Sequence, residues 1–123
     1  MNNVCKKLIV LLLLAVVILL PGCSHDDREF LADISVPLEN GSAEIVIKEW
    51  RWLLGSGAEI YYQKNDTLTL LGETTGGDDG YCPFEAGKFT LNVEGSELVV
   101  RWSFRGNDPE DSWRENRFAI PSD

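Results

Sequence analysis

A run of thirteen consecutive apolar residues, from Leu8 to Leu20, holds much of the hydrophobic content of this 123-residue chain. The run is too short to cross a membrane, because a spanning helix needs about 20 apolar residues. Lys6 and Lys7 precede it and Pro21-Gly22-Cys23 follows it, and this order of positive, apolar and small residues is typical of a secretory signal. We therefore predict that residues 1–22 form a cleaved signal helix.

The rest of the chain is polar, acidic and short. Cleavage before Cys23 would remove Lys6 and Lys7 and leave nine basic residues against 20 acidic residues, a net charge of −11. A chain of about 100 residues forms a single domain. The strong negative charge argues against binding to nucleic acid and against electrostatic adhesion to anionic lipid.

The sequence Leu20-Pro21-Gly22-Cys23 resembles the lipobox of bacterial lipoproteins, in which a branched apolar residue stands three positions before the cysteine and a small residue directly before it. The resemblance implies that Cys23 receives a diacylglyceryl group and becomes the new N-terminus. Two acyl chains such as palmitate hold a protein on a membrane stably, whereas one binds only marginally. We expect an extracytoplasmic protein anchored to a bacterial membrane by lipid. The alternative is an ordinary secreted protein.

The chain after the signal has the pattern of an all-β protein. Short segments rich in Ile, Val, Tyr, Trp and Phe alternate with Gly, Asn and Asp. Strands are expected at 43–52, 58–64, 67–71, 88–93, 97–104 and 114–120. The clearest pair flanks Glu94-Gly95-Ser96, where apolar residues take alternate positions on both sides of the turn. We predict a small antiparallel barrel or sandwich of six to seven strands.

The expected organisation has three parts: the signal peptide at 1–22, a lipidated N-terminus and tether at 23–40, and the all-β domain at 41–123. A short helical turn or a first strand within the tether is left open. In segment 43–52, Ile45 and Ile47 lie on one face and Trp50 and Trp52 on the other. This strand is therefore expected to be covered on both sides or to contain a bulge.

The chain lacks the residues that most catalytic mechanisms need. Its only histidine, His25, falls in the tether, so Cys–His and Ser–His–Asp mechanisms have no positioned base, and zinc sites of His and Cys are excluded. After Cys5 leaves with the signal and Cys23 takes lipid, Cys82 remains. We interpret Cys82 as a buried small hydrophobic residue, with a reactive or intermolecular thiol as the alternative. We expect no enzyme activity and no cofactor.

The candidate binding site consists of two acidic loops. Residues 72–87 form a long, glycine-rich connection, and such loops are usually functional or mobile. A second acidic turn spans 107–111. The candidate residues for a partner or ligand are Asp78, Asp79, Tyr81, Asp108, Asp111 and Trp113. The carboxylates of the two loops could bind Ca²⁺, although the spacing is not that of an EF-hand, or the loops could be ordinary solvated turns.

Tryptophan is the second notable feature, because Trp and Tyr are favoured where proteins bind partners or sugars. We expect at least three of the four tryptophans, Trp50, Trp52, Trp102 and Trp113, to pack in the core. Trp102 lies on the alternating apolar face and is the clearest core residue. Trp113 follows an acidic loop and is the first candidate for a binding role.

These observations favour a non-catalytic, membrane-anchored lipoprotein that presents an acidic β-domain to an envelope protein or a wall component. One alternative is an inhibitor or protective protein against a basic hydrolase such as lysozyme. Others are a Ca²⁺-binding structural domain and a carboxylate hydrolase. The sequence leaves open the identity of the partner, the membrane that carries the anchor and the oligomeric state.

Overall fold

The structure is a computed structural model that describes residues 27–39 and 41–122. These residues form eight strands and two single-turn 3₁₀-helices, with no α-helix among them. In chain order the elements are β1 (Glu29–Phe30), β2 (Ile34–Pro37), β3 (Glu44–Trp52), β4 (Gly55–Lys64), β5 (Thr67–Thr75), η2 (Asp78–Gly80), β6 (Phe89–Glu94), β7 (Glu97–Trp102), η3 (Glu110–Ser112) and β8 (Arg114–Ala119). The all-β prediction is confirmed.

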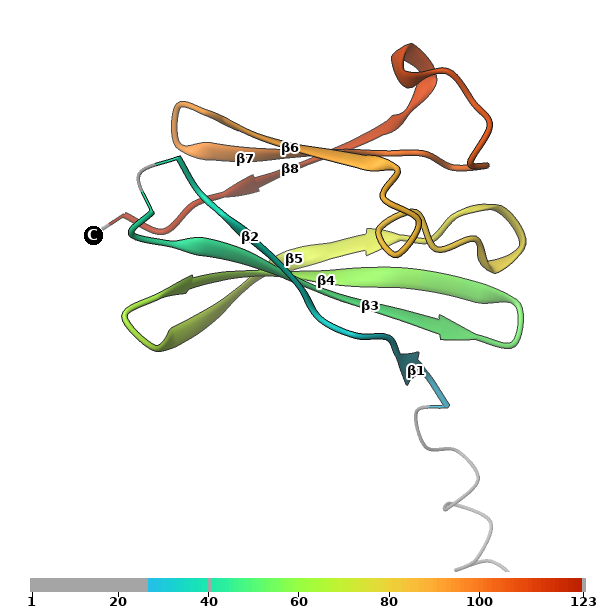
Figure 1. The fold of residues 1–123 in the computed structure, drawn as a ribbon, viewed down its shortest axis with the longest axis horizontal. Coiled ribbons are helices and arrows are strands. Elements are labelled where there is room, and N and C mark those ends of the chain that lie inside the picture. The colour runs from blue at the N-terminus through green and yellow to red at the C-terminus, as the bar shows by residue number, and fades with distance from the viewer. Residues whose placement is uncertain (1–26, 40, 123) are drawn as a thin grey trace, which may run out of the picture.

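The strands form two antiparallel sheets, which lie as two layers in Figure 1. In the larger sheet, β3 pairs with β1 and β2 along one edge and with β4 along the other, and β4 pairs with β5. In the smaller sheet the order is β6-β7-β8. Of the two predicted forms, a sandwich and a barrel, the fold is therefore the sandwich.

The six segments expected to be strands all form strands, and two short strands come in addition. Both β1 and β2 lie within the segment interpreted as a tether. Phe30 pairs with Trp50 and Ile34 pairs with Ile47, so both strands belong to the edge of β3. The folded part of the chain therefore extends back at least to Glu29.

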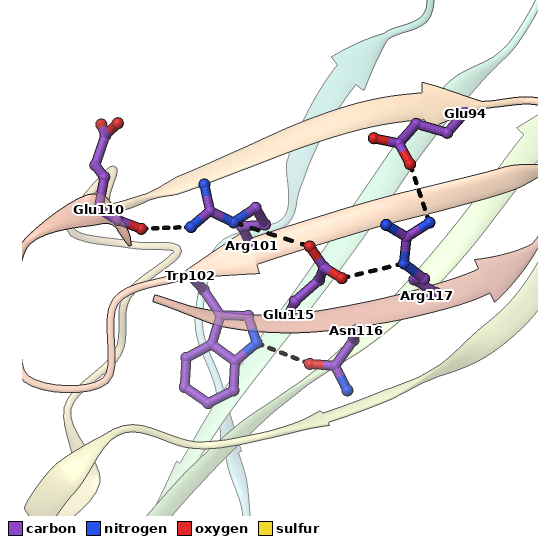
Figure 2. A network of polar contacts seen from close by, with 7 residues as sticks. All are labelled: Glu94, Arg101, Trp102, Glu110, Glu115, Asn116 and Arg117. Atoms are coloured by element: carbon purple, nitrogen blue, oxygen red, sulfur yellow. Dashed lines mark hydrogen bonds and ion pairs between the residues drawn. The ribbon is translucent and has the colours of Figure 1, made fainter. Parts of the chain in front are cut away.

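The core lies between the two sheets and receives residues from both. Its buried members are Ile45, Ile47, Ala58 and Ile60 from the larger sheet, Leu98, Val100 and Trp102 from the smaller one, and Phe84 from the β5–β6 loop. Burying side chains of this size contributes about 1.5–3 kcal/mol each. The Trp102 indole, 1% exposed, donates from Nε1 to Asn116 Oδ1 at 2.9 Å, as Figure 2 shows, so its polar atom is satisfied.

The pairing of β3 with β4 is regular from Glu44 to Trp52, so β3 contains no bulge. The register shift lies instead between β4 and β5, at Ile60 and Tyr61. On the outer face of β3, Val46 is buried and Trp50 is half-buried, whereas Trp52 is exposed. Of the two explanations for the mixed pattern of this strand, a bulge within β3 is excluded, and its outer face is only partly buried.

Candidate functional site

The β5–β6 loop and the β7–β8 loop are hydrogen-bonded to each other at one end of the sandwich. The Asp78 N–H donates across to the Phe104 carbonyl at 2.8 Å, whereas the Gly77 N–H donates within the β5–β6 loop, to the Tyr81 carbonyl at 3.1 Å. Gly106 has φ +88° and lies so close to the Tyr81 ring that a Cβ there would be 2.9 Å from Cζ. Only glycine meets both conditions, so the contact between the loops depends on it.

The start of β4 is hydrogen-bonded to the β5–β6 loop. Ser56 is buried, and its hydroxyl donates to the Tyr81 carbonyl at 2.8 Å. We refer to residues 76–87 and 103–113 together as the loop end. In Figure 1 it lies on the same side of the molecule as β1 and the turn between β3 and β4.

Asp108 organises the β7–β8 loop from inside. Its carboxylate accepts hydrogen bonds from the Ser103 hydroxyl, from Phe104 N at 3.0 Å and from Arg105 N at 3.4 Å. The Ser103 hydrogen bond is the main reason why the pKa of Asp108 lies below its usual value, and the backbone donors add to it. The Asp108 carbonyl also accepts from Trp113 Nε1 at 3.2 Å. Asp108 therefore shapes the loop, and most of its acceptor capacity is used there.

Glu49 holds the backbone of the β5–β6 loop in the same way. This residue was not identified from the sequence. It shares the core face of β3 with Ile45 and Ile47 and is 1% exposed. Its two carboxylate oxygens accept from Phe84 N at 3.0 Å and from Glu85 N at 2.7 Å. Burial raises the pKa of Glu49, and the two backbone donors only partly oppose this. An acid two positions after Ile47 in an alternating strand was the available signal.

The structure brings four of the six candidate residues together and leaves two apart. Asp78 and Tyr81 contact the β7–β8 loop, and Trp113 contacts Asp108 within that loop. Asp79 in η2 and Asp111 in η3 are exposed, and no hydrogen bond or ion pair among the described residues uses their carboxylates. Asp78 lies 3.9 Å from Arg105 Nε. In the described ranges, no group of three or more His, Cys, Asp or Glu side chains is arranged to hold a metal ion.

Cys82 is half-buried, so it is neither a fully buried core residue nor an exposed thiol. Its Sγ contacts the Gly80 carbonyl at 3.5 Å. Burial, followed by the nearby carboxylates of Glu49 and Glu85, raises the pKa of the thiol. The reactive thiolate is therefore disfavoured at neutral pH.

The expectation that at least three tryptophans pack in the core is wrong. Trp102 is buried there, Trp50 and Trp113 are half-buried, and Trp52 is 49% exposed. The reason is that Trp50 and Trp52 point to the outer face of the larger sheet, which no second layer covers in the described part of the chain. Trp52, rather than Trp113, is the most accessible indole.

The outer face of the larger sheet is rich in aromatic and apolar side chains. Trp50 lies flat over Gly57, where a Cβ would be 2.5 Å from its Cζ2. The Arg28 guanidinium sits over the rings of Trp50 and Phe30, at 5.2 and 5.5 Å from their centroids. The exposed large hydrophobic residues of this sheet are Phe30, Trp52, Leu53, Leu54, Leu68 and Leu70.

The outer face of the smaller sheet is charged instead, as Figure 2 shows. Arg117 pairs with Glu94 at 3.0 Å and with Glu115 at 3.1 Å, and Arg101 lies 4.0 Å from Glu115. Arg101 also donates to the Glu110 carbonyl of η3. This face therefore satisfies much of its charge within the molecule.

A cavity of about 570 Å³ opens between the sheets at the end opposite to the loop end. Its apolar walls include Tyr62, Leu91 and Ile120, and Lys64 and Glu39 also line it. None of the six candidate residues lines it.

Comparisons with protein-family models, with curated proteins and with solved structures gave no match. The predicted signal peptide and lipid attachment site, Cys23, lie outside the described residues. Within 27–39 and 41–122, no helix is long and apolar enough to span a membrane.

Proposed function

We propose that this chain is a non-catalytic lipoprotein of the bacterial cell envelope that binds a basic partner protein through the carboxylates of its loop end. The observation that carries the proposal is the interlocking of two acidic loops, fixed by the Asp78–Phe104 and Ser56–Tyr81 hydrogen bonds. Binding residues are commonly carried on loops that a rigid scaffold positions.

The anchor is inferred from the sequence. Two lysines, an apolar run and Leu20-Pro21-Gly22-Cys23 follow one another in the order of a lipoprotein signal. A diacylated Cys23 would keep the domain on the membrane. The folded strands begin at Glu29, so only a short segment would separate the domain from its anchor.

The chemistry of the described side chains favours binding over catalysis. Glu49 and Asp108, whose pKa values are raised and lowered respectively, both hold loop backbone in place. The raised pKa of Cys82 disfavours a nucleophilic thiolate.

The charge of the loop end suits a basic partner. Asp79, Glu85, Glu110 and Asp111 are all exposed there. A strongly negative protein attracts cationic partners over several ångströms and speeds their encounter. A basic hydrolase such as lysozyme has the required charge, and salt would weaken the complex.

The test measures binding of the mature lipoprotein in detergent micelles to a panel of basic proteins that includes lysozyme, at low and at physiological salt. The variant D79N/D111N removes two loop-end charges, and Asn tolerates the φ of 51° at position 79. The matched control, E39Q/D66N, removes two charges outside the loop end.

We expect D79N/D111N to weaken binding by about tenfold, which corresponds to about 1.4 kcal/mol, and the control to change it little. Equal loss in both variants would mean that net charge alone attracts the partner, and the loop-end assignment would be wrong. Absence of binding to every basic protein at low salt would reject the proposed function.

A further inference from the structure

The turn between β3 and β4 is unusually apolar. Trp52 pairs with Gly55, and the two residues between them are Leu53 and Leu54, which are 85% and 80% exposed. Trp52 itself is 49% exposed. The turn thus presents three large apolar side chains in a row to solvent.

The fold does not require leucine at these positions. Neither Leu53 nor Leu54 belongs to the core cluster or packs against it. Neither has a positive φ, so the backbone makes no special demand on the residue type. Turns normally carry polar residues, and an exposed apolar group of this size commonly marks an interaction site.

The position of the turn relative to the predicted anchor indicates what it contacts. Glu29 in β1 pairs with Arg51, two residues before Leu53. Cys23 precedes Glu29 by six residues. Because an extended chain spans at most about 3.6 Å per residue, Cys23 lies within about 22 Å of Glu29 whatever path the chain takes.

The opposite end of the sheet is held farther from the anchor. The ten residues of β4 span about 33 Å, and they separate the Leu53-Leu54 turn from the turn at Asn65-Asp66. Figure 1 shows β1 beside the β3–β4 end of the sheet, with the β4–β5 turn on the other side. A lipid on Cys23 would therefore bring the leucine turn, and not the polar one, to the bilayer.

We propose that the Trp52-Leu53-Leu54 turn inserts into the surface of the membrane that holds the lipid anchor. This inference rests on the proposed anchor at Cys23. The two leucines enter the acyl region, and Trp52 lies at the headgroup level, where amphipathic indoles are favoured. Because the mature chain is strongly acidic, we assign zwitterionic rather than anionic headgroups as the contact.

The anchor makes such a small contact effective. A turn of three residues would bind a membrane weakly on its own, but attachment through Cys23 makes its insertion an intramolecular event with a high effective concentration. The domain then stands with its loop end near the bilayer. A partner of the loop end would be met close to the membrane surface.

The experiment uses the mature lipoprotein in phosphatidylcholine vesicles, with Cys82→Ser to remove the other thiol. An environment-sensitive fluorophore is attached through Leu54→Cys or, as the matched control, through Leu68→Cys. Leu68 is 44% exposed and lies in β5 of the same sheet, where it pairs with Gln63 near the far end of β4. Flotation reports anchoring, and quenching by lipids brominated in their acyl chains reports insertion.

We expect both proteins to float, with a blue shift and quenching of the label at position 54 and neither effect at position 68. Flotation without a difference between the positions overturns the insertion and leaves the anchor standing. A protein that does not float overturns both proposals. Circular dichroism of both labelled variants establishes that each retains the β fold.

Discussion

The two turns that flank β4 differ in what explains their sequence. Asn65 and Asp66 have φ values of 51° and 64°, the left-handed conformation that a tight hairpin requires and that Asn and Asp tolerate best. Leu53 and Leu54 occupy a turn with no such requirement and are almost fully exposed. Folding accounts for the first pair of residues. It does not account for the second, which indicates a role outside the fold.

The largest effect on stability is expected at neither turn but at Glu49. Glu49→Ala releases the β5–β6 loop and leaves the Asn65-Asp66 turn intact. The Phe84 amide would lose its acceptor in a buried place, and the Glu85 amide would lose its acceptor in a partly buried one. An unsatisfied buried donor costs about 1–3 kcal/mol, so we expect a loss of about 1–3 kcal/mol in the free energy of unfolding. Urea denaturation measures it. A loss below about 0.5 kcal/mol, the range of ordinary surface substitutions, would show that Glu49 does not hold the loop.

The pH dependence of stability should separate Glu49 and Asp108, the two acids that hold the loops. Since the pKa of Glu49 is raised above its ordinary value of 4.5, the folded state holds this proton more tightly than the unfolded state. Its contribution is greatest below pH 4.5 and declines as the pH rises through the folded pKa, by at most about 1.4 kcal/mol per pH unit. Unfolding measured across this range should give a flatter profile for E49Q than for the parent protein.

The pKa of Asp108 is shifted in the opposite direction, so its contribution to stability has the opposite pH dependence. Because its pKa is lowered, its stabilising contribution is present above the ordinary carboxyl pKa and is lost as the pH falls through the folded value. D108N should therefore remove acid sensitivity rather than sensitivity to rising pH. Identical profiles for E49Q and D108N would contradict the roles assigned to the two acids.

The polar turn gives the next largest effect. Asp66→Ala places a Cβ-bearing residue without a compensating side-chain hydrogen bond at φ 64°, and we expect a loss of about 1 kcal/mol. Asp66→Gly, the matched control, removes the same carboxylate but accepts the conformation. Thermal unfolding should rank the glycine variant above the alanine variant. The reverse order would mean that the turn conformation does not select its residues.

The smallest effect is expected at the leucine turn. Leu53→Asn with Leu54→Asn should change the free energy of unfolding of the soluble domain by less than about 0.5 kcal/mol, since the two side chains bury almost nothing. Urea denaturation of the two proteins tests this. A large loss would show that the leucines serve the fold, and the main argument for their interaction with a membrane would be removed.

The sequence predicted the long strands well, because their signals are local. Alternation on both sides of Glu94-Gly95-Ser96 predicts a hairpin, and the structure contains it, with Val93 opposite Leu98. The short strands β1 and β2 carry little signal of their own, since only the edge of β3 makes them strands. The same limit explains why a helical turn in this segment could not be excluded.

The candidate site depended on contacts that no local pattern encodes. The contact between Asp78 and Phe104 joins loops 26 residues apart in the sequence, and nothing in the residues of either loop specifies the other as its neighbour. Asp108 looks like a surface acid in the sequence, yet three donors hold its carboxylate. The exposure of Trp52 followed from the lack of a layer over the outer face of β3 in the described part of the chain, which depends on how all the strands are arranged.

The most direct measurement is the mass of the N-terminal peptide of the protein recovered from the membranes of a bacterium that expresses it. We predict a peptide that begins at Cys23 and carries a diacylglyceryl group on its sulfur. A peptide that still begins at Met1, or a soluble protein with an unmodified Cys23, would contradict the anchor and with it the placement of the leucine turn at a membrane.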